Sequence, residues 1–250
     1  MPEKKLLTVA SGKGGVGKTW MSVTLSHTLA TLGRRVLLFD GDLGLANVDI
    51  QLGITPEMDL GSFISGDASL AAITTRYDQT QHGFDIIPGK SGSGALGALS
   101  REMLIKIRSS LVGRAVDYDH VILDLAAGID QSVMTLSKHM GTILVVMTAD
   151  PTSLTDAYAF IKVTAARNPA ADIRVAVNNV PSKREGEKAF ERIKKVCEGF
   201  LKISPPLAGI VRHDPRVTDA IRAQYPLLAR HPQSDAAADV TALAKSLFKA

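Results

Sequence analysis

The sequence predicts an α/β fold with a mostly parallel, twisted sheet and helices on both of its faces. Five short apolar runs rich in β-branched residues support this prediction: residues 6–10, 36–39, 121–123, 142–147 and 173–177. Each run is too short for a helix, and near-continuous apolar strands are typical of a parallel sheet that is covered on both sides. Most of the runs are separated by segments with helical periodicity, which is the alternation expected of strands joined by helices.

Helices are predicted between these runs. Apolar residues recur near helical spacing after the first run, at Trp20, Val23, Leu25, Leu29 and Leu32. Gly33 is expected to end that helix, because glycine readily adopts the left-handed conformation of a C-terminal cap. A second helix is predicted over residues 99–116 with Ser100 as its N-terminal cap. Others are predicted after Pro151 and over residues 186–200.

Composition narrows the class of protein further. The chain has 250 residues, of which 45% are hydrophobic and 22% charged, and its net charge is +4. This balance excludes disorder, collagen and a disulfide scaffold. We find no repeat and no linker long enough to divide the chain, so one domain over residues 1–250 is expected. No apolar run is long enough to span a bilayer and only one cysteine is present, so we expect a cytoplasmic protein.

A glycine-rich segment follows the first predicted strand. Residues 11–19 read Ser-Gly-Lys-Gly-Gly-Val-Gly-Lys-Thr and contain the Gly-x-x-x-x-Gly-Lys-Thr pattern of a phosphate-binding loop. Glycines let the backbone N–H groups turn toward phosphate oxygens, and the following helix presents the positive end of its dipole. We expect Lys18 to neutralise the β and γ phosphates of ATP and the Thr19 hydroxyl to bind Mg²⁺. Lys13 adds a second cation, which would repel Lys18 unless phosphate lies between them.

Aspartates follow two other predicted strands. Asp40 and Asp42 come after the run at 36–39, and Asp124 comes directly after the run at 121–123. Ligands bind at the carboxyl edge of a parallel sheet, so these aspartates should lie beside the phosphate loop. We expect Asp124 to hold Mg²⁺ through water and Asp42 to position the attacking water. The alternative for Asp42, and more so for Asp40, is that the carboxylate caps the next helix.

These segments resemble the MinD/ParA family of deviant Walker A ATPases. The loop at residues 13–19 carries that family's additional lysine. Residues 40–53 and 150–158 are similar to segments of the flagellar-number regulators called FlhG or FleN. The resemblance runs from about residue 5 to residue 221 and implies a P-loop fold, slow ATP hydrolysis and an ATP-dependent homodimer. It also implies a role in the number or placement of flagella or of another polar structure.

The resemblance also implies roles for individual residues. Lys13 would reach across the dimer to the partner's phosphates, and Asp42 would be the catalytic aspartate. Asn178 would contact adenine, and Arg212 and Asp214 would close the adenine pocket. The predicted catalytic residues are Lys13, Lys18 and Asp42, and the predicted Mg²⁺ residues are Thr19, Asp42 and Asp124. The predicted nucleotide-binding residues are Ser11, Gly12, Lys13, Gly14, Gly15, Val16, Gly17, Lys18, Thr19, Trp20, Asn178, Arg212 and Asp214.

The sequence departs from the family pattern at three places. Trp20 stands where a second threonine is usual, and we expect the bulky indole to change the fit of the nucleotide. Leu125 and Ala126 replace an Asp-Thr pair, which removes a hydroxyl near the γ phosphate. Val211 stands where proline is common. None of these changes removes a predicted catalytic or Mg²⁺-binding residue.

Partners are less closely defined by the sequence. A protein partner at the cell pole or flagellar base is expected. Residues 239–250 form an amphipathic pattern, which is either a peripheral membrane contact at the inner membrane or the last helix of the core. The alternative functions are a ParA-type ATPase that binds nucleoid DNA and a MinD-type division-site regulator. Basic residues gather over residues 183–195, but interleaved glutamates favour a solvated helix face over a nucleic-acid interface.

Overall fold

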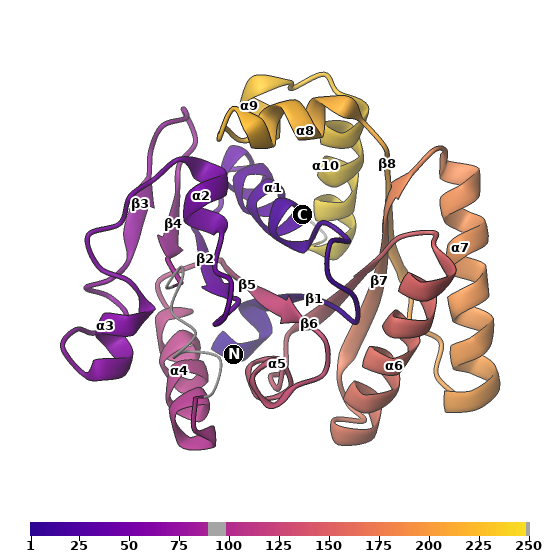
Figure 1. The fold of residues 1–250 in the computed structure, drawn as a ribbon, viewed down its shortest axis with the longest axis horizontal. Helices are drawn as coiled ribbons and strands as arrows, with labels where there is room; N and C mark the ends of the chain where they lie inside the picture. Colours follow the sequence, from indigo (N-terminus) through magenta and orange to yellow (C-terminus); the bar gives the residue numbers. More distant parts are fainter. Residues whose placement is uncertain (90–98, 249–250) are drawn as a thin grey trace.

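The computed structural model describes residues 1–89 and 99–248, and its centre is one eight-stranded sheet (Figure 1). In spatial order the strands are β3 (Thr75–Tyr77), β4 (Phe84–Ile87), β2 (Val36–Gly41), β5 (His120–Ala127), β1 (Leu6–Ser11), β6 (Thr142–Met147), β7 (Asp172–Val180) and β8 (Leu207–Arg212). The only antiparallel pair among these strands is β3 with β4. The predicted fold class is confirmed.

All five predicted strands are present, as β1, β2, β5, β6 and β7, and three further strands were missed. The missed strands carry weak signals. β3 is three residues long, Asp85 interrupts the apolar run of β4, and Gly209 interrupts that of β8. These strands form because they extend the sheet at its two ends, where pairing with a neighbour outweighs weak strand propensity.

Helices cover both faces of the sheet (Figure 1). One face packs against α4 (Arg101–Arg114), α5 (Gln131–Leu136), α6 (Pro151–Arg167) and α7 (Lys183–Val196). The other face packs against α1 (Lys18–Thr31), α2 (Val48–Leu52), α8 (Pro215–Arg222), α9 (Leu227–Arg230) and α10 (Asp235–Leu247). The short helix α3 (Leu60–Ser65) lies near the β3 end of the sheet, and short 3₁₀ and π segments occupy Pro2–Lys5 and Cys197–Leu201.

The predicted helix caps explain where α1 ends and where α4 begins. Gly33 has a φ of +76°, and the N–H groups of Gly33 and Arg34 donate to the carbonyls of Ala30 and Leu29 at 2.9 and 3.1 Å. These bonds satisfy carbonyls that the last turn leaves free. The Ser100 hydroxyl accepts a hydrogen bond from the Met103 N–H at 3.2 Å and caps α4. The end of α1 and the start of α4 therefore lie at the caps that the sequence predicted, Gly33 and Ser100.

The C-terminal helix α10 packs into the core. Its apolar residues Val240, Leu243 and Leu247 are buried in the cluster that also contains residues of α1 and β1. Phe248 lies against His120, with 4.1 Å between the ring centroids. The apolar side chains considered above as a membrane contact are thus used to cover the sheet, and the helix begins at Asp235 rather than at residue 239. Residues 249 and 250 lie outside the described part of the chain.

Long apolar helices are absent from the described residues. No helix over residues 1–89 or 99–248 is both long enough and apolar enough to cross a membrane.

Candidate functional site

The glycine-rich segment forms a loop between β1 and α1 at the carboxyl edge of the central strands. The Ser11 hydroxyl donates to the Lys13 carbonyl at 2.7 Å and holds the start of the loop. At Gly12 an added Cβ would lie 2.0 Å from the Asp156 carbonyl oxygen, so only glycine allows α6 to pack this closely. Gly17 has a φ of +93°, which favours glycine at the start of α1.

Asn178 fixes the loop from the end of β7. Its side chain is buried, and its amide Nδ2 donates to the Val16 carbonyl at 2.9 Å. An added Cβ at Gly17 would lie 2.5 Å from the same nitrogen. Asn178, predicted to contact adenine, therefore already supports the loop backbone, and this contact joins two segments that are 162 residues apart.

The two strand-end aspartates lie side by side. Asp40 on β2 and Asp124 on β5 are register partners in neighbouring parallel strands, and both are fully buried. The Ser22 hydroxyl donates to Asp124 Oδ1 at 3.0 Å, and Thr19 also forms a side-chain hydrogen bond with this carboxylate. Burial raises the pKa of Asp124 to about 6, against the hydrogen bonds from Thr19 and Ser22 and the charge of Lys18.

Asp40 has a structural role in this arrangement. Its Oδ2 accepts hydrogen bonds from the N–H groups of Asn47 and Val48 at 2.9 Å each, so it fastens the loop after β2 to the start of α2. Burial and the nearby charge of Asp124 raise the pKa of Asp40 to about 7. The capping alternative considered from the sequence therefore describes Asp40.

Lys18 and Asp42 complete the polar cluster. Burial lowers the pKa of Lys18, and the charges of Asp124 and Asp42 oppose that shift. Asp42 is half-buried, and its Oδ1 accepts a hydrogen bond from the Leu45 N–H at 3.0 Å and a longer one from Gly44 at 3.4 Å. Its carboxylate thus orders its own loop beside the ammonium group of Lys18.

The donor set fits Mg²⁺ bound together with a nucleotide. The hydroxyl of Thr19 and the carboxylates of Asp42 and Asp124 are oxygen ligands, which Mg²⁺ prefers. Within residues 1–89 and 99–248 no group of three or more His, Cys, Asp or Glu residues is placed to hold a metal by itself. A site with few protein ligands is what Mg²⁺ needs when substrate phosphates and water supply the others.

Lys13 is directed along the surface of its own chain. Its Nζ donates to the Thr152 hydroxyl at 2.7 Å, at the first turn of α6. The contact is exposed, so it holds the lysine only weakly.

The loop after β5 contacts the start of the phosphate loop. Gly128 has a φ of +105°, and its N–H donates to the Ser11 carbonyl at 2.9 Å. The loop after β5 is therefore joined directly to the phosphate loop.

A cavity of about 290 Å³ adjoins the phosphate loop. Its lining comes from the loop, α1, the ends of β7 and β8, and α8: Gly15, Val16, Gly17, Trp20, Asn178, Asn179, Arg212, His213, Asp214, Val217, Thr218 and Ile221. The residues predicted to contact or close around adenine therefore line one space. Three polar residues of the site were not predicted: Ser22, Asn179 and His213. Ser22 lies one helical turn after Lys18, and this spacing was a usable signal.

Arg212 and Asp214 also have partners within the chain. Arg212 forms ion pairs with Asp239 and Asp235 at 2.9 Å each, which attach the end of β8 to α10. Asp214 caps α8 by accepting from the Arg216 N–H at 2.9 Å, and it accepts from the Ala236 N–H at 3.3 Å. Both residues border the cavity while holding its wall together.

Trp20 forms part of the cavity wall and is almost fully buried. Its indole Nε1 has no hydrogen-bond partner in the described part of the chain. The indole also packs with Val16 and Met21 in the apolar cluster on this face of the sheet. The indole therefore lies next to the phosphate loop, and its effect on the fit of the nucleotide stays a prediction.

The comparisons with known proteins agree with this geometry. A family model described as the CobQ/CobB/MinD/ParA nucleotide binding domain matches residues 7–227. The antiactivator FleN of Pseudomonas aeruginosa is 35% identical over 243 residues, covering 97% of this chain and 86% of its own. The flagellum site-determining protein YlxH of Helicobacter pylori is 31% identical, covering 79% of this chain and 65% of its own.

A solved structure extends the similarity over the fold. The septum site-determining protein MinD of Pyrococcus horikoshii, solved as a complex with Mg-ADP, superposes with a TM-score of 0.82 at 25% identity. The superposition covers 98% of this chain and 96% of that one. Because the family model matches most of the chain and the phosphate loop and acidic strand ends lie together, this chain belongs to the MinD/ParA ATPases of the CobQ/CobB/MinD/ParA nucleotide-binding family.

Proposed function

We propose that the chain is an ATP-driven switch that controls the number or placement of flagella. The observation that carries this proposal is the cluster of Lys18, Asp42 and Asp124 at the carboxyl edge of a chain similar to FleN over 97% of its length. Similarity to YlxH, whose name also refers to flagella, supports the same role. We further propose that residues 1–250 act as one cytoplasmic ATPase domain.

The proposed chemistry rests on charge and position. Lys18 and Lys13 stabilise negative charge on the transferred phosphoryl group, and Asp42 orients the water that attacks it. Thr19 and Asp124 would hold Mg²⁺, Asp124 through water. When bound, the metal neutralises charge on the β and γ phosphate oxygens. The hydrogen bonds from Thr19 and Ser22 and the charge of Lys18 favour the ionised form of Asp124, which a metal-side ligand needs, and oppose the rise in its pKa that burial causes.

ATP binding would produce a homodimer in which Lys13 contacts the partner's phosphates. The bond between Lys13 and Thr152 lies at the surface, so breaking it to reach a partner costs little. The proposed dimer would dock to a protein partner at the cell pole or flagellar base. Since the apolar face of α10 is buried, any peripheral membrane contact would need another surface.

Size-exclusion chromatography with light scattering tests the dimer. Asp42→Ala should form a stable dimer with ATP and Mg²⁺, because nucleotide binds and hydrolysis is blocked. Asp42→Ala combined with Lys13→Ala should remain monomeric while still binding ATP. A monomer for Asp42→Ala at saturating ATP would refute the proposed dimer, and equal dimer formation by both variants would refute the role of Lys13.

Cell biology and a DNA titration test the role. Deleting the gene should change the number or position of flagella, and Lys18→Ala should fail to restore them. A fluorescent fusion should gather at the pole rather than over the nucleoid. A ParA-type function would instead give binding to random duplex DNA that falls steeply with salt. Normal flagella in the deletion strain together with such DNA binding would overturn the flagellar role.

A further inference from the structure

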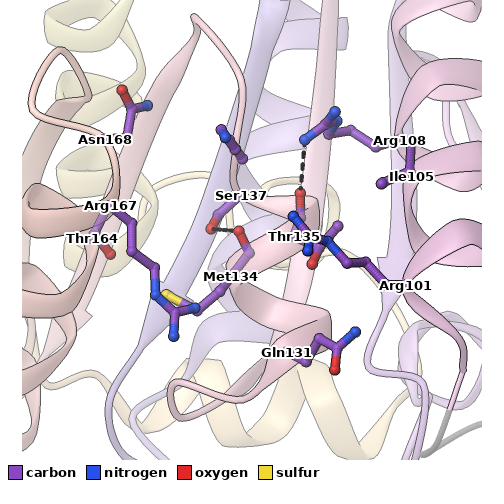
Figure 2. Close-up of a pocket in the computed structure, with 11 residues that line it drawn as sticks. Arg101, Ile105, Arg108, Gln131, Met134, Thr135, Ser137, Thr164, Arg167 and Asn168 are labelled. Carbon is purple, nitrogen blue, oxygen red and sulfur yellow. Dashed lines mark hydrogen bonds between the residues drawn. The ribbon is translucent and has the colours of Figure 1, made fainter.

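A second cavity lies on the face of the sheet opposite α1 and α10. It has a volume of about 650 Å³ and lies between α4, α5 and the C-terminal end of α6. Figure 2 shows Arg101 and Arg108 on one side, Thr164 and Arg167 on the other, and residues of α5 between them. A space of this size matches the 300–1,000 Å³ that small-molecule sites usually occupy.

The rim of this cavity is strongly basic. Four cationic side chains line it, Arg101, Arg108, Lys138 and Arg167, and no acidic side chain does. In the described part of the chain none of the four forms an ion pair, and Arg108 donates only a long hydrogen bond of 3.4 Å to the Thr135 carbonyl. Arg101 interacts electrostatically with its chain neighbour Glu102.

The wall of the cavity opposite Arg101 and Arg108 offers little free polar surface. Thr164 is only 5% exposed, and its hydroxyl oxygen is shielded from solvent, with no hydrogen-bond partner among the described residues. Met134 and Ile105 add apolar surface to the lining. Polar recognition at this cavity therefore rests on the cations of its rim.

We propose that this cavity binds a small organic molecule that carries two phosphate groups. Phosphate matches the fork of an arginine side chain through paired N–H donors, and cations on two opposite walls fit two separate anionic groups. The volume is too large for one inorganic anion, and the apolar surface of Met134 and Ile105 suits the organic body between the phosphates.

The site is separate from the phosphate loop although it shares two structural elements with it. α6 begins at Pro151, beside the Thr152–Lys13 contact, and reaches this cavity with Thr164 and Arg167 at its other end. α5 begins at Gln131, shortly after Gly128. Binding measurements must therefore be made with the phosphate loop already occupied.

Isothermal titration calorimetry with fructose 1,6-bisphosphate tests the proposal. The full chain is first saturated with ADP and Mg²⁺, so that the probe cannot enter the phosphate loop. One site per chain is expected, and Arg167→Ala should weaken it by about tenfold or more, the usual effect of losing a charge-assisted hydrogen bond. Arg184→Ala removes the same charge from exposed α7 and should leave the affinity unchanged. Inorganic phosphate should bind more weakly than the bisphosphate.

Thr164→Val separates the loss of a cation from a change in packing. Because valine has nearly the same shape without the hydroxyl, the variant should melt at the same or a higher temperature without ligand. It should bind the bisphosphate with unchanged affinity, because the Thr164 hydroxyl oxygen is shielded from the cavity. Failure of the probe to bind the ADP-saturated chain, or equal affinities for Arg167→Ala and Arg184→Ala, would overturn the proposal.

Discussion

Leu243→Ala on α10 tests whether the C-terminal helix belongs to the core. Leu243 is 1% exposed, and an added Cβ at Gly209 would lie 2.9 Å from the Leu243 Cβ, so the backbone of β8 packs directly against it. Truncating a leucine in such a site costs about 2–5 kcal/mol, and the tight packing places this one near about 3 kcal/mol. For a chain of this length that loss lowers the melting temperature by about 6–12 °C.

The assay pairs thermal unfolding, followed by circular dichroism, with cosedimentation on vesicles of anionic phospholipid. Leu32→Ala is the matched control, because Leu32 is 42% exposed and its truncation should change stability by less than about 0.5 kcal/mol. Leu243→Ala should lose stability without any specific loss of vesicle binding. An unchanged melting temperature together with reduced vesicle binding would refute the packing of α10 described above and favour a membrane contact.

Three further predictions concern single residues. Gly17→Ala should weaken Mg-ATP binding by at least about tenfold in a Trp20 fluorescence titration, because the positive φ of Gly17 and the nearby Asn178 nitrogen both oppose a Cβ. Gly14→Ala is the control, because a Cβ there meets no atom within 4 Å, and equal binding by the two variants would contradict this prediction. Burial, aided by the charge of Arg108, lowers the pKa of His139 to about 4, so the free energy of unfolding should fall as pH drops from about 6.5 to about 4. His139→Gln should flatten that loss in urea titrations, and an unchanged pH profile would show that His139 does not cause it. Burial raises the pKa of the Cys197 thiol to about 11, so a disulfide reagent should label it slowly in the native chain and rapidly in urea, and fast native labelling would show that the π segment opens.

The elements with regular patterns could be predicted from the sequence. The run at 142–147 became β6 with the same bounds, and Gly33 and Ser100 cap the helices for which they were proposed. Short or interrupted elements such as β3 and β8 could not, because their strands are stabilised by a neighbouring strand or helix rather than by their own residues. The same limit applies to Asp40, whose capping partners Asn47 and Val48 follow only from the path of the loop.

The sequence by itself determined the phosphate loop, the carboxylates that follow the strands and the family, because these depend on residue types at fixed spacing along the chain. The tertiary structure alone decided what each polar group contacts. It placed Asn178 against the Val16 carbonyl, attached Arg212 to Asp239 and turned the apolar face of α10 onto the sheet. It also gathered cations from α4, from α6 and from the segment after α5 around one cavity. Such contacts join residues that are far apart in the chain, and local patterns carry no information about which distant groups will meet.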